Sequence, residues 1–241
     1  MPPEEAMEYA KPELLAEPDW LTAHADDPNV RIIDCASLDA YRRAHIPGAV
    51  GLPVHFYIKE DDSGGSDHGT FITPQPAFEK LMAQLGVSNE TTVVTYDDNN
   101  SLVATRVWWA LKYYGHTNTK VLNGGWHRWQ SEGRPATFHA TRAPAATFTA
   151  RPNRAVYATA DDLLATIGDD ACQIFDARTD GEWDGSNSRG NKRVGHVPGA
   201  KHLEWINFME KGDTRRFLPA EACERLLAEA GIHRGKKTVS Y

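Results

Sequence analysis

The sequence predicts an α/β fold built of two similar α/β halves, each a mainly parallel sheet with helices on both faces. Short β-branched strands alternate with helical segments, which is typical of parallel sheets. At 241 residues and 26.7 kDa, the chain has room for two modest domains. A set of residues also recurs at a constant offset, which indicates an internal repeat. Pro74, Gly86 and Tyr96 each recur 145 residues later, as Pro219, Gly231 and Tyr241.

The first half has the elements of one complete domain. The β-branched run Thr92–Asp97 predicts a buried strand, and the apolar residues from Leu102 have helical spacing. In chain order we expect a helix at 19–24, a strand at 30–34, a polar Gly-rich loop at 60–70, a helix at 74–86, the strand at 92–97, the helix from 102, and a strand at 120–122 followed by a Gly-Gly turn.

The loop between this strand and helix is a candidate anion site. Asp97 to Ser101 favour turns and helix caps. Backbone N–H groups converge at a helix N-terminus, and the helix dipole favours negative charge there. For Asp97 itself we expect a structural role, with its side chain capping the helix that follows.

The second half repeats the pattern in part. Residues 135–158 are rich in Ala, Thr, Pro and Arg without clear periodicity, which is typical of a linker. We therefore predict an N-terminal domain at 1–134, a linker at 135–158 and a C-terminal domain at 159–241. The second copy has a helix at 160–164, a strand at 172–176, a helix at 219–231 and a strand at 238–241.

Nothing in this chain matches residues 97–130 a second time. Half a parallel sheet leaves strand edges unpaired and an apolar face uncovered. We therefore expect the second domain to be incomplete in this chain, and to be completed by a separate C-terminal segment or by a longer chain.

Composition excludes several classes of protein. The net charge of −7 and the isoelectric point near 5.8 argue against nucleic acid and anionic membranes as partners. No apolar run reaches membrane-spanning length, and no signal or transit peptide is visible. The three cysteines are far apart and form no CxxC motif, which argues against a zinc site or a disulfide framework. These features predict a cytoplasmic protein.

Together, the motifs resemble those of the tandem rhodaneses, the thiosulfate and 3-mercaptopyruvate sulfurtransferases. The first half contributes four motifs and the second half two, in the same order. They are Asp34 with His45-Ile46-Pro47-Gly48-Ala49, the strand Val93-Val94-Thr95-Tyr96-Asp97, Arg106-Val107-Trp108-Trp109, Leu122-Asn123-Gly124-Gly125-Trp126, Asp176-Ala177-Arg178, and Gly195-His196-Val197-Pro198-Gly199-Ala200.

The resemblance implies which half performs catalysis. In this family the first half is catalytically silent and usually has Asp at the nucleophile position, which here is Asp97. The second half carries a nucleophilic Cys directly after the strand, at the position that follows Tyr241. None of the 241 residues is then the nucleophile, so the 1–241 chain alone is predicted to be inactive.

The implied reaction is transfer of a sulfane sulfur. A thiolate attacks the outer sulfur of thiosulfate, holds it as a persulfide and passes it to cyanide or a thiol. A helix N-terminus lowers the pKa of such a thiol and stabilises the persulfide without a metal or another cofactor. The partners implied are therefore a small anionic sulfur donor and a cyanide or thiol acceptor.

An insertion in the second copy supplies the candidate substrate-binding residues. The offset is 142 residues between Asp34 and Asp176 but 151 between the two motif histidines, so the second copy has nine extra residues there. They enlarge a cationic region in which Arg189 and Arg193 would attract a dianion. A solvated charged loop explains the same residues equally well. The resemblance adds Trp205 as an aromatic residue lining the pocket.

The other polar and thiol residues are expected to have structural roles. We expect the three cysteines to be core residues, the two motif histidines to hold their turns, and the two aspartates at strand ends to tie backbone turns. These residues are Cys35, Cys172, Cys223, His45, His196, Asp34 and Asp176.

Three alternatives remain open at the level of the sequence. A non-catalytic rhodanese-homology module for binding or regulation would have no Cys after Tyr241. A phosphatase or arsenate reductase on the same fold would need a longer Cys loop that ends in Arg. A 3-mercaptopyruvate sulfurtransferase is disfavoured, because Glu182 stands where mammalian relatives often have Arg.

Overall fold

The structure is a computed structural model that describes residues 8–52 and 72–241. The described residues form two compact units. The N-terminal unit comprises residues 11–156, apart from the gap, together with 211–216, and the C-terminal unit comprises residues 8–10, 157–210 and 217–241. The Gly-rich loop predicted at 60–70 lies outside the described residues.

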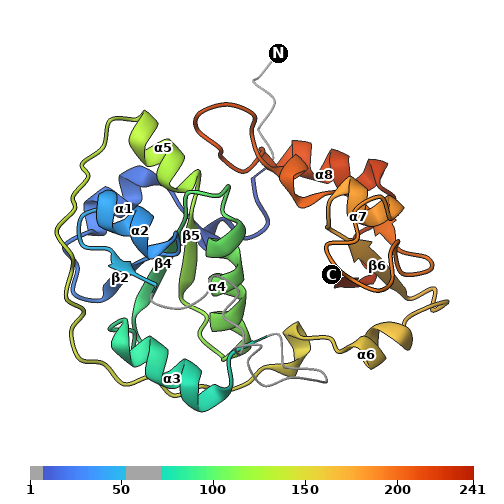
Figure 1. Cartoon of the computed structure of the whole chain (residues 1–241), viewed down its shortest axis with the longest axis horizontal. Helices are drawn as coiled ribbons and strands as arrows, with labels where there is room; N and C mark the ends of the chain where they lie inside the picture. Colours follow the sequence, from blue (N-terminus) through green and yellow to red (C-terminus); the bar gives the residue numbers. More distant parts are fainter. Residues whose placement is uncertain (1–7, 53–71) are drawn as a thin grey trace. The chain divides into compact units, whose positions relative to one another are not determined.

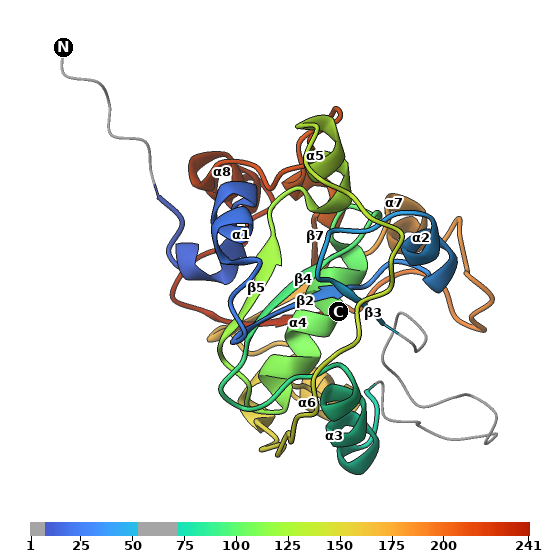
Figure 2. The same cartoon turned by 90° about the vertical axis from the view of Figure 1, so that its left-hand side faces the viewer.

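The N-terminal unit contains a parallel sheet of five strands. The strands are β1 (Leu15–Ala16), β2 (Val30–Asp34), β3 (Val50–Gly51), β4 (Thr92–Tyr96) and β5 (Thr119–Leu122). Their order in the sheet is β1-β5-β4-β2-β3, and Figure 2 shows the last four side by side. Asp34 pairs with Tyr96 in the register of β2 and β4. The residues that follow these two strands therefore lie together at the carboxyl edge of the sheet.

Helices cover both faces of this sheet (Figure 1). They are α1 (Pro18–His24), α2 (Leu38–Arg43), α3 (Gln75–Gln84), α4 (Leu102–Tyr113) and α5 (Gly125–Ser131). Successive strand residues face opposite sides. On one side, Val94 and Tyr96 share a core cluster with Leu21 of α1 and Trp129 of α5. On the other side, the Thr95 hydroxyl donates to the carbonyl oxygen of Ala104 in α4.

Helix α5 is the main difference from the elements expected in the first half. Gly124 and Gly125 both have positive φ, at 89° and 51°, which is the turn predicted there. A Cβ on Gly125 would lie 2.6 Å from the carbonyl oxygen of Asp97, so this position requires glycine. The turn leads directly into α5, whereas the sequence analysis predicted only a turn.

The first part of the predicted linker packs against the N-terminal unit. It has no helix or strand between 141 and 153, but Phe148 is buried. The backbone N–H of Arg151 donates to the carbonyl oxygen of Tyr114, and the N–H of Thr149 donates to the side chain of Asn89. The segment therefore forms part of the N-terminal unit through Val156. The domain boundaries given above remain a prediction.

The C-terminal unit has a smaller parallel sheet of the same kind. Its strands are β6 (Cys172–Asp176), β7 (Lys201–His202) and β8 (Lys237–Ser240), and its helices are α6 (Ala160–Leu164), α7 (Asp180–Asp184) and α8 (Ala220–Glu229). The strand order β7-β6-β8 corresponds to β3-β2-β4 of the first sheet. The predicted fold class, two related α/β sheets of which the second is the smaller, is confirmed.

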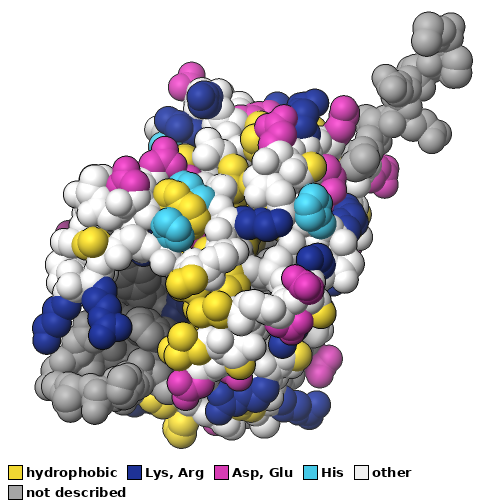
Figure 3. Space-filling model, turned by 90° about the vertical axis from the view of Figure 1, so that its right-hand side faces the viewer, with side chains coloured by type: hydrophobic (Ala, Val, Ile, Leu, Met, Phe, Trp, Pro, Cys, Tyr) yellow, Lys and Arg dark blue, Asp and Glu magenta, His cyan; other side chains and the backbone are white. Residues whose placement is uncertain are grey.

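The C-terminal unit buries fewer apolar side chains. Its buried positions include Ile174, Ile232 and Val239, whereas Leu164 and Val194 are 63% and 59% exposed. Figure 3, a space-filling view of one side of the chain, shows apolar side chains at the surface among charged ones. Among the described residues, none of the helices combines the length and the apolar composition needed to span a bilayer.

Candidate functional site

In the N-terminal unit, Tyr96 connects the carboxyl edge of the sheet to the His-Ile-Pro-Gly turn. Its hydroxyl donates to Oδ2 of Asp34 (2.6 Å) and accepts the backbone N–H of Ile46 (3.1 Å). Oδ1 of Asp34 accepts the N–H of Ala36 (2.9 Å). Burial raises the pKa of Asp34 to about 6. Asp34 therefore ties the turn after β2, as the sequence predicted.

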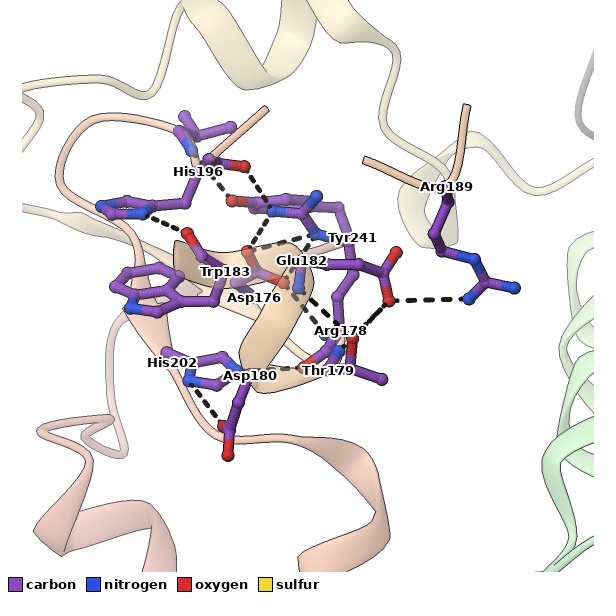
Figure 4. A network of polar contacts seen from close by, with 12 residues as sticks. Asp176, Arg178, Thr179, Asp180, Glu182, Trp183, Arg189, His196, His202 and Tyr241 are labelled. Carbon is purple, nitrogen blue, oxygen red and sulfur yellow. Dashed lines mark hydrogen bonds and ion pairs between the residues drawn. The ribbon is translucent and has the colours of Figure 1, made fainter. Parts of the chain in front are cut away.

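The C-terminal unit repeats this arrangement and adds an arginine (Figure 4). The Tyr241 hydroxyl accepts the N–H of Val197 (2.9 Å) and shares a hydrogen bond with Asp176. The Arg178 guanidinium donates to both oxygens of Asp176 (3.0 and 2.6 Å) and lies 4.9 Å from the centre of the Tyr241 ring. Burial raises the pKa of Asp176, but the hydrogen bonds from Arg178 outweigh that effect and leave the pKa below its ordinary value.

Asp97 fills a ring of backbone N–H groups directly after β4. Its carboxylate accepts the N–H groups of Asn99, Ser101, Val103 and Ala104, at 2.7 to 2.9 Å. The side chain is almost fully buried; burial raises its pKa, and the four N–H donors oppose that shift. The carboxylate caps α4, which is the structural role expected for it. It also occupies the place that a bound anion would take in this loop.

Arg189, a predicted substrate-binding residue, lies beside a carboxylate. Its guanidinium is 3.5 Å from Glu182, and the Arg189 side chain is 55% exposed. Glu182 closes a capping box with Thr179 at the start of α7, because its carboxylate accepts from Thr179 while the Thr179 hydroxyl accepts the N–H of Glu182. The attraction of Arg189 for a dianion is therefore opposed by Glu182.

The other two predicted substrate-binding residues lie in different settings. Arg193 is exposed in the segment between α7 and the motif histidine. Trp205 is half-buried, and its N–H donates to the carbonyl oxygen of Ala177, directly after β6. Trp205 therefore lies near the carboxyl edge of this sheet. The roles assigned to these residues remain predictions.

A stack of three rings was not predicted from the sequence. The ring of Trp183 in α7 lies between His196 and His202, with centroids 3.5 Å and 4.9 Å away and nearly parallel planes (Figure 4). Nδ1 of His196 contacts the carbonyl oxygen of Trp183 (3.0 Å), and Nε2 of His202 contacts that of Arg178 (2.9 Å). The motif histidine therefore holds its turn against α7, as expected.

The first motif histidine and Cys35 also have the structural roles that were expected. His45 is fully buried, and its ring nitrogens contact the carbonyl oxygens of Tyr41 (2.6 Å) and His139 (3.2 Å). Cys35 is buried, but Cys172 and Cys223 are only half-buried, so the expectation that all three cysteines are core residues holds fully for Cys35 alone.

None of these thiols is activated. Burial raises the pKa of Cys35 and of Cys223, and a hydrogen bond with Asp169 raises that of Cys172. Across the part of the chain that the structure describes, no cluster of three His, Cys, Asp or Glu residues is placed to hold a metal ion.

Comparisons with known proteins identify the family. The family described as Rhodanese-like domain matches residues 17–132. The sulfur carrier protein TtuD of Thermus thermophilus is 34% identical over 257 aligned positions, which cover 98% of this chain and 84% of that protein. The chain belongs to the rhodanese family of sulfurtransferases.

Two further relatives match nearly the whole chain. A putative thiosulfate sulfurtransferase of Mycobacterium tuberculosis is 30% identical, with 96% of this chain and 83% of that protein covered. The crystal structure of SseA from Escherichia coli, described among 3-mercaptopyruvate sulfotransferases, superposes with a TM-score of 0.81 at 25% identity, with 94% of this chain and 87% of that chain covered. Both halves of the chain are therefore related to rhodanese-family proteins.

Proposed function

We propose that this protein transfers the sulfane sulfur of thiosulfate to cyanide or a thiol, through a persulfide on a Cys that directly follows Tyr241 in the encoded protein. The proposal also takes the N-terminal half to be catalytically silent and the protein to act in the cytoplasm. The observation that supports it most is the equivalence of Tyr96 and Tyr241. Each hydroxyl is held by an Asp at a strand end and by the backbone of an X-Pro-Gly turn.

This equivalence gives the residue after each tyrosine the same position in its domain. In the first domain that residue is Asp97, whose carboxylate is surrounded by four N–H donors. A thiolate in such a loop has its pKa lowered, and a persulfide anion there is stabilised. A carboxylate cannot accept a sulfane sulfur, which supports a silent first domain.

The proposed reaction has two steps. The thiolate attacks the outer sulfur of thiosulfate; an S–S bond forms on the enzyme, the S–S bond of thiosulfate breaks, and sulfite leaves with the electron pair. Cyanide then attacks the sulfane sulfur, thiocyanate leaves and the thiolate is regenerated. Charge balances in both steps, and neither step consumes an oxidant or a reductant.

A thiosulfate:cyanide assay tests the proposal. The 1–241 polypeptide should produce no thiocyanate, because its three thiols have raised pKa values and Cys35, which lies between β2 and α2, is buried. A protein extended through the whole C-terminal domain should produce it, and should lose the activity when the Cys after Tyr241 is replaced by Ser. Absence of a Cys at that position in the gene would favour the non-catalytic binding module instead.

A second donor, 3-mercaptopyruvate, is favoured by the similarity to SseA. The argument against this donor is that Glu182 stands where mammalian relatives often have Arg, so a cation that could pair with the carboxylate of mercaptopyruvate is missing there. Parallel assays with the two donors decide between them. A kcat/KM for mercaptopyruvate above that for thiosulfate would reverse the proposed preference.

A further inference from the structure

A pocket opens at the carboxyl edge of the N-terminal sheet, beside Asp34 and Tyr96. Its volume is about 220 Å³, and its walls include Ala40 of α2 and Trp126 of α5. A single water needs only about 10–15 Å³ of such space, so the pocket has room for a ligand of several heavy atoms. The sulfur transfer proposed above uses none of these side chains.

Two carboxylates line this pocket. Asp34 is 2% exposed and accepts hydrogen bonds from Tyr96 and Ala36. A carboxylate accepts up to about four hydrogen bonds, so Asp34 keeps acceptor capacity toward the pocket. Asp98 is exposed and also lines the pocket. Among the described residues, no hydrogen bond or ion pair involves its carboxylate. The two carboxylates therefore favour a positively charged group between them.

An aromatic ring and a guanidinium complete the lining. The Trp126 ring contributes a wall of the pocket and lies at 28° to the ring of Tyr96, with centroids 6.5 Å apart. Trp faces attract ammonium groups and pack well against short carbon chains. Arg43 also lines the pocket and, within the described chain, has no ion-pair partner. It is therefore suited to a carboxylate on the same ligand.

We propose that this pocket binds a small free α-amino acid, with its ammonium group on Asp34 and Asp98, its carboxylate on Arg43 and its side chain against Trp126. Opposite charges line one small space, which matches a zwitterion better than a simple cation or anion. The site lies in the half of the molecule taken to be silent in sulfur transfer, and its occupancy can be measured without turnover.

Calorimetric titration of the 1–241 chain tests the proposal with three matched probes. L-Alanine carries both charged groups, ethylamine only the ammonium and propionate only the carboxylate. L-Alanine should bind most tightly, ethylamine about tenfold more weakly and propionate not measurably, because each charge-assisted contact is worth at least about tenfold in affinity. Equal binding of ethylamine and L-alanine, or binding of propionate alone, would overturn the assignment.

Variants of the lining provide the second test. Asp34→Asn should weaken L-alanine binding at least about tenfold. Ala40→Leu fills the pocket from a helix without removing a polar group, so it should abolish binding even if Asp34→Asn perturbs the turn after β2. Glu90→Gln, an exposed acid in the same unit, is the control and should leave binding unchanged. Undiminished binding by a folded Ala40→Leu variant would contradict the proposed site.

Discussion

Asp34 and Asp176 hold equivalent places at the ends of β2 and β6, yet their surroundings differ by one guanidinium. Arg178 forms an ion pair with Asp176 (2.6 Å), whereas the residue at the same place after Asp34 is Ala36. Burial therefore dominates at Asp34 and, with the negative charge of Asp98, raises its pKa, while Arg178 holds the pKa of Asp176 below its ordinary value. The same backbone turn is thus tied by two carboxyl groups with opposite pH behaviour.

This difference predicts opposite titrations. Asp34 should titrate near pH 6, against an ordinary value of 3.8, and Asp176 below 3.8. The contribution of the Asp34 carboxyl group to the free energy of unfolding is fully present below pH 3.8. It falls by about 3 kcal/mol as the pH rises through about 6. The contribution of the Asp176 carboxylate to the free energy of unfolding is present above its ordinary pKa of 3.8. It is lost as the pH falls through the lowered pKa of the folded protein. Carboxyl-carbon NMR titration of the wild type, with Asp34→Asn and Asp176→Asn to assign the signals, checks both. Equal midpoints would contradict the account.

Replacing Asp97 should destabilise the N-terminal unit. Asp97→Ala leaves four N–H groups of the loop and α4 without their acceptor, so we expect a loss of about 2 kcal/mol or more in the free energy of unfolding. Urea denaturation measures it. Asp39→Ala, an exposed acid in the first turn of α2, is the matched control and should cost less than about 0.5 kcal/mol. If both variants lose equal stability, the capping role of Asp97 is wrong.

At the scale of elements, the strands and long helices could be predicted because their signals are local. The β-branched runs at β2 and β4 and the Pro and Gly bounds of α3 are readable without tertiary contacts. Helix α5 could not be predicted, because its first residue is a glycine that is required by the nearby carbonyl of Asp97. That contact exists only after β4 and β5 pair.

The residues of the candidate site also fall into two groups, those that sequence motifs reveal and those that only the fold brings together. Asp34, Asp176 and the turn histidines were found from repeated motifs. The stack of Trp183 on His196 and His202 was missed, because these residues come from three separate segments and no spacing connects them. The ion pair between Arg189 and Glu182 was also missed, since Glu182 was considered only as a departure from the family pattern.

The loop after α7 gives a prediction about donor use. Replacing Arg189 and Arg193 together by Ala should raise the KM for thiosulfate in the complete enzyme by about tenfold or more, because each charge-assisted contact is worth about 1.5–3 kcal/mol. Arg225→Ala, an exposed arginine on α8, is the control and should change nothing. An unchanged KM in the double variant would show that the loop is only a solvated surface.

A matched change at Glu182 separates its two contacts. Glu182→Gln keeps the capping box with Thr179, because Gln serves at this position, but removes the charge that pairs with Arg189. The freed guanidinium should lower the KM for thiosulfate while helix content stays unchanged. A higher KM would mean that the ion pair positions Arg189 for the donor.

At the scale of the whole molecule, the two units differ in how well their sheets are covered. The five-stranded sheet buries apolar side chains on both faces, such as Val94 on one and Val93 on the other, whereas Ala220 is the one buried residue of α8 in the C-terminal unit. Small cores give low local stability. Amide hydrogen exchange of the 1–241 chain should therefore be faster in β6 and β8 than in β2 and β4. Equal protection in the two sheets would contradict this expectation.

The central claim is that the residue after Tyr241 carries the sulfur, and that Asp97 marks the corresponding place in a silent domain. Mass spectrometry of the complete protein after incubation with thiosulfate tests it most directly. The account predicts a gain of one sulfur atom, which peptide mapping places on the Cys that follows Tyr241, and no gain in the 1–241 chain. Sulfur found on Cys35, Cys172 or Cys223 instead would contradict it.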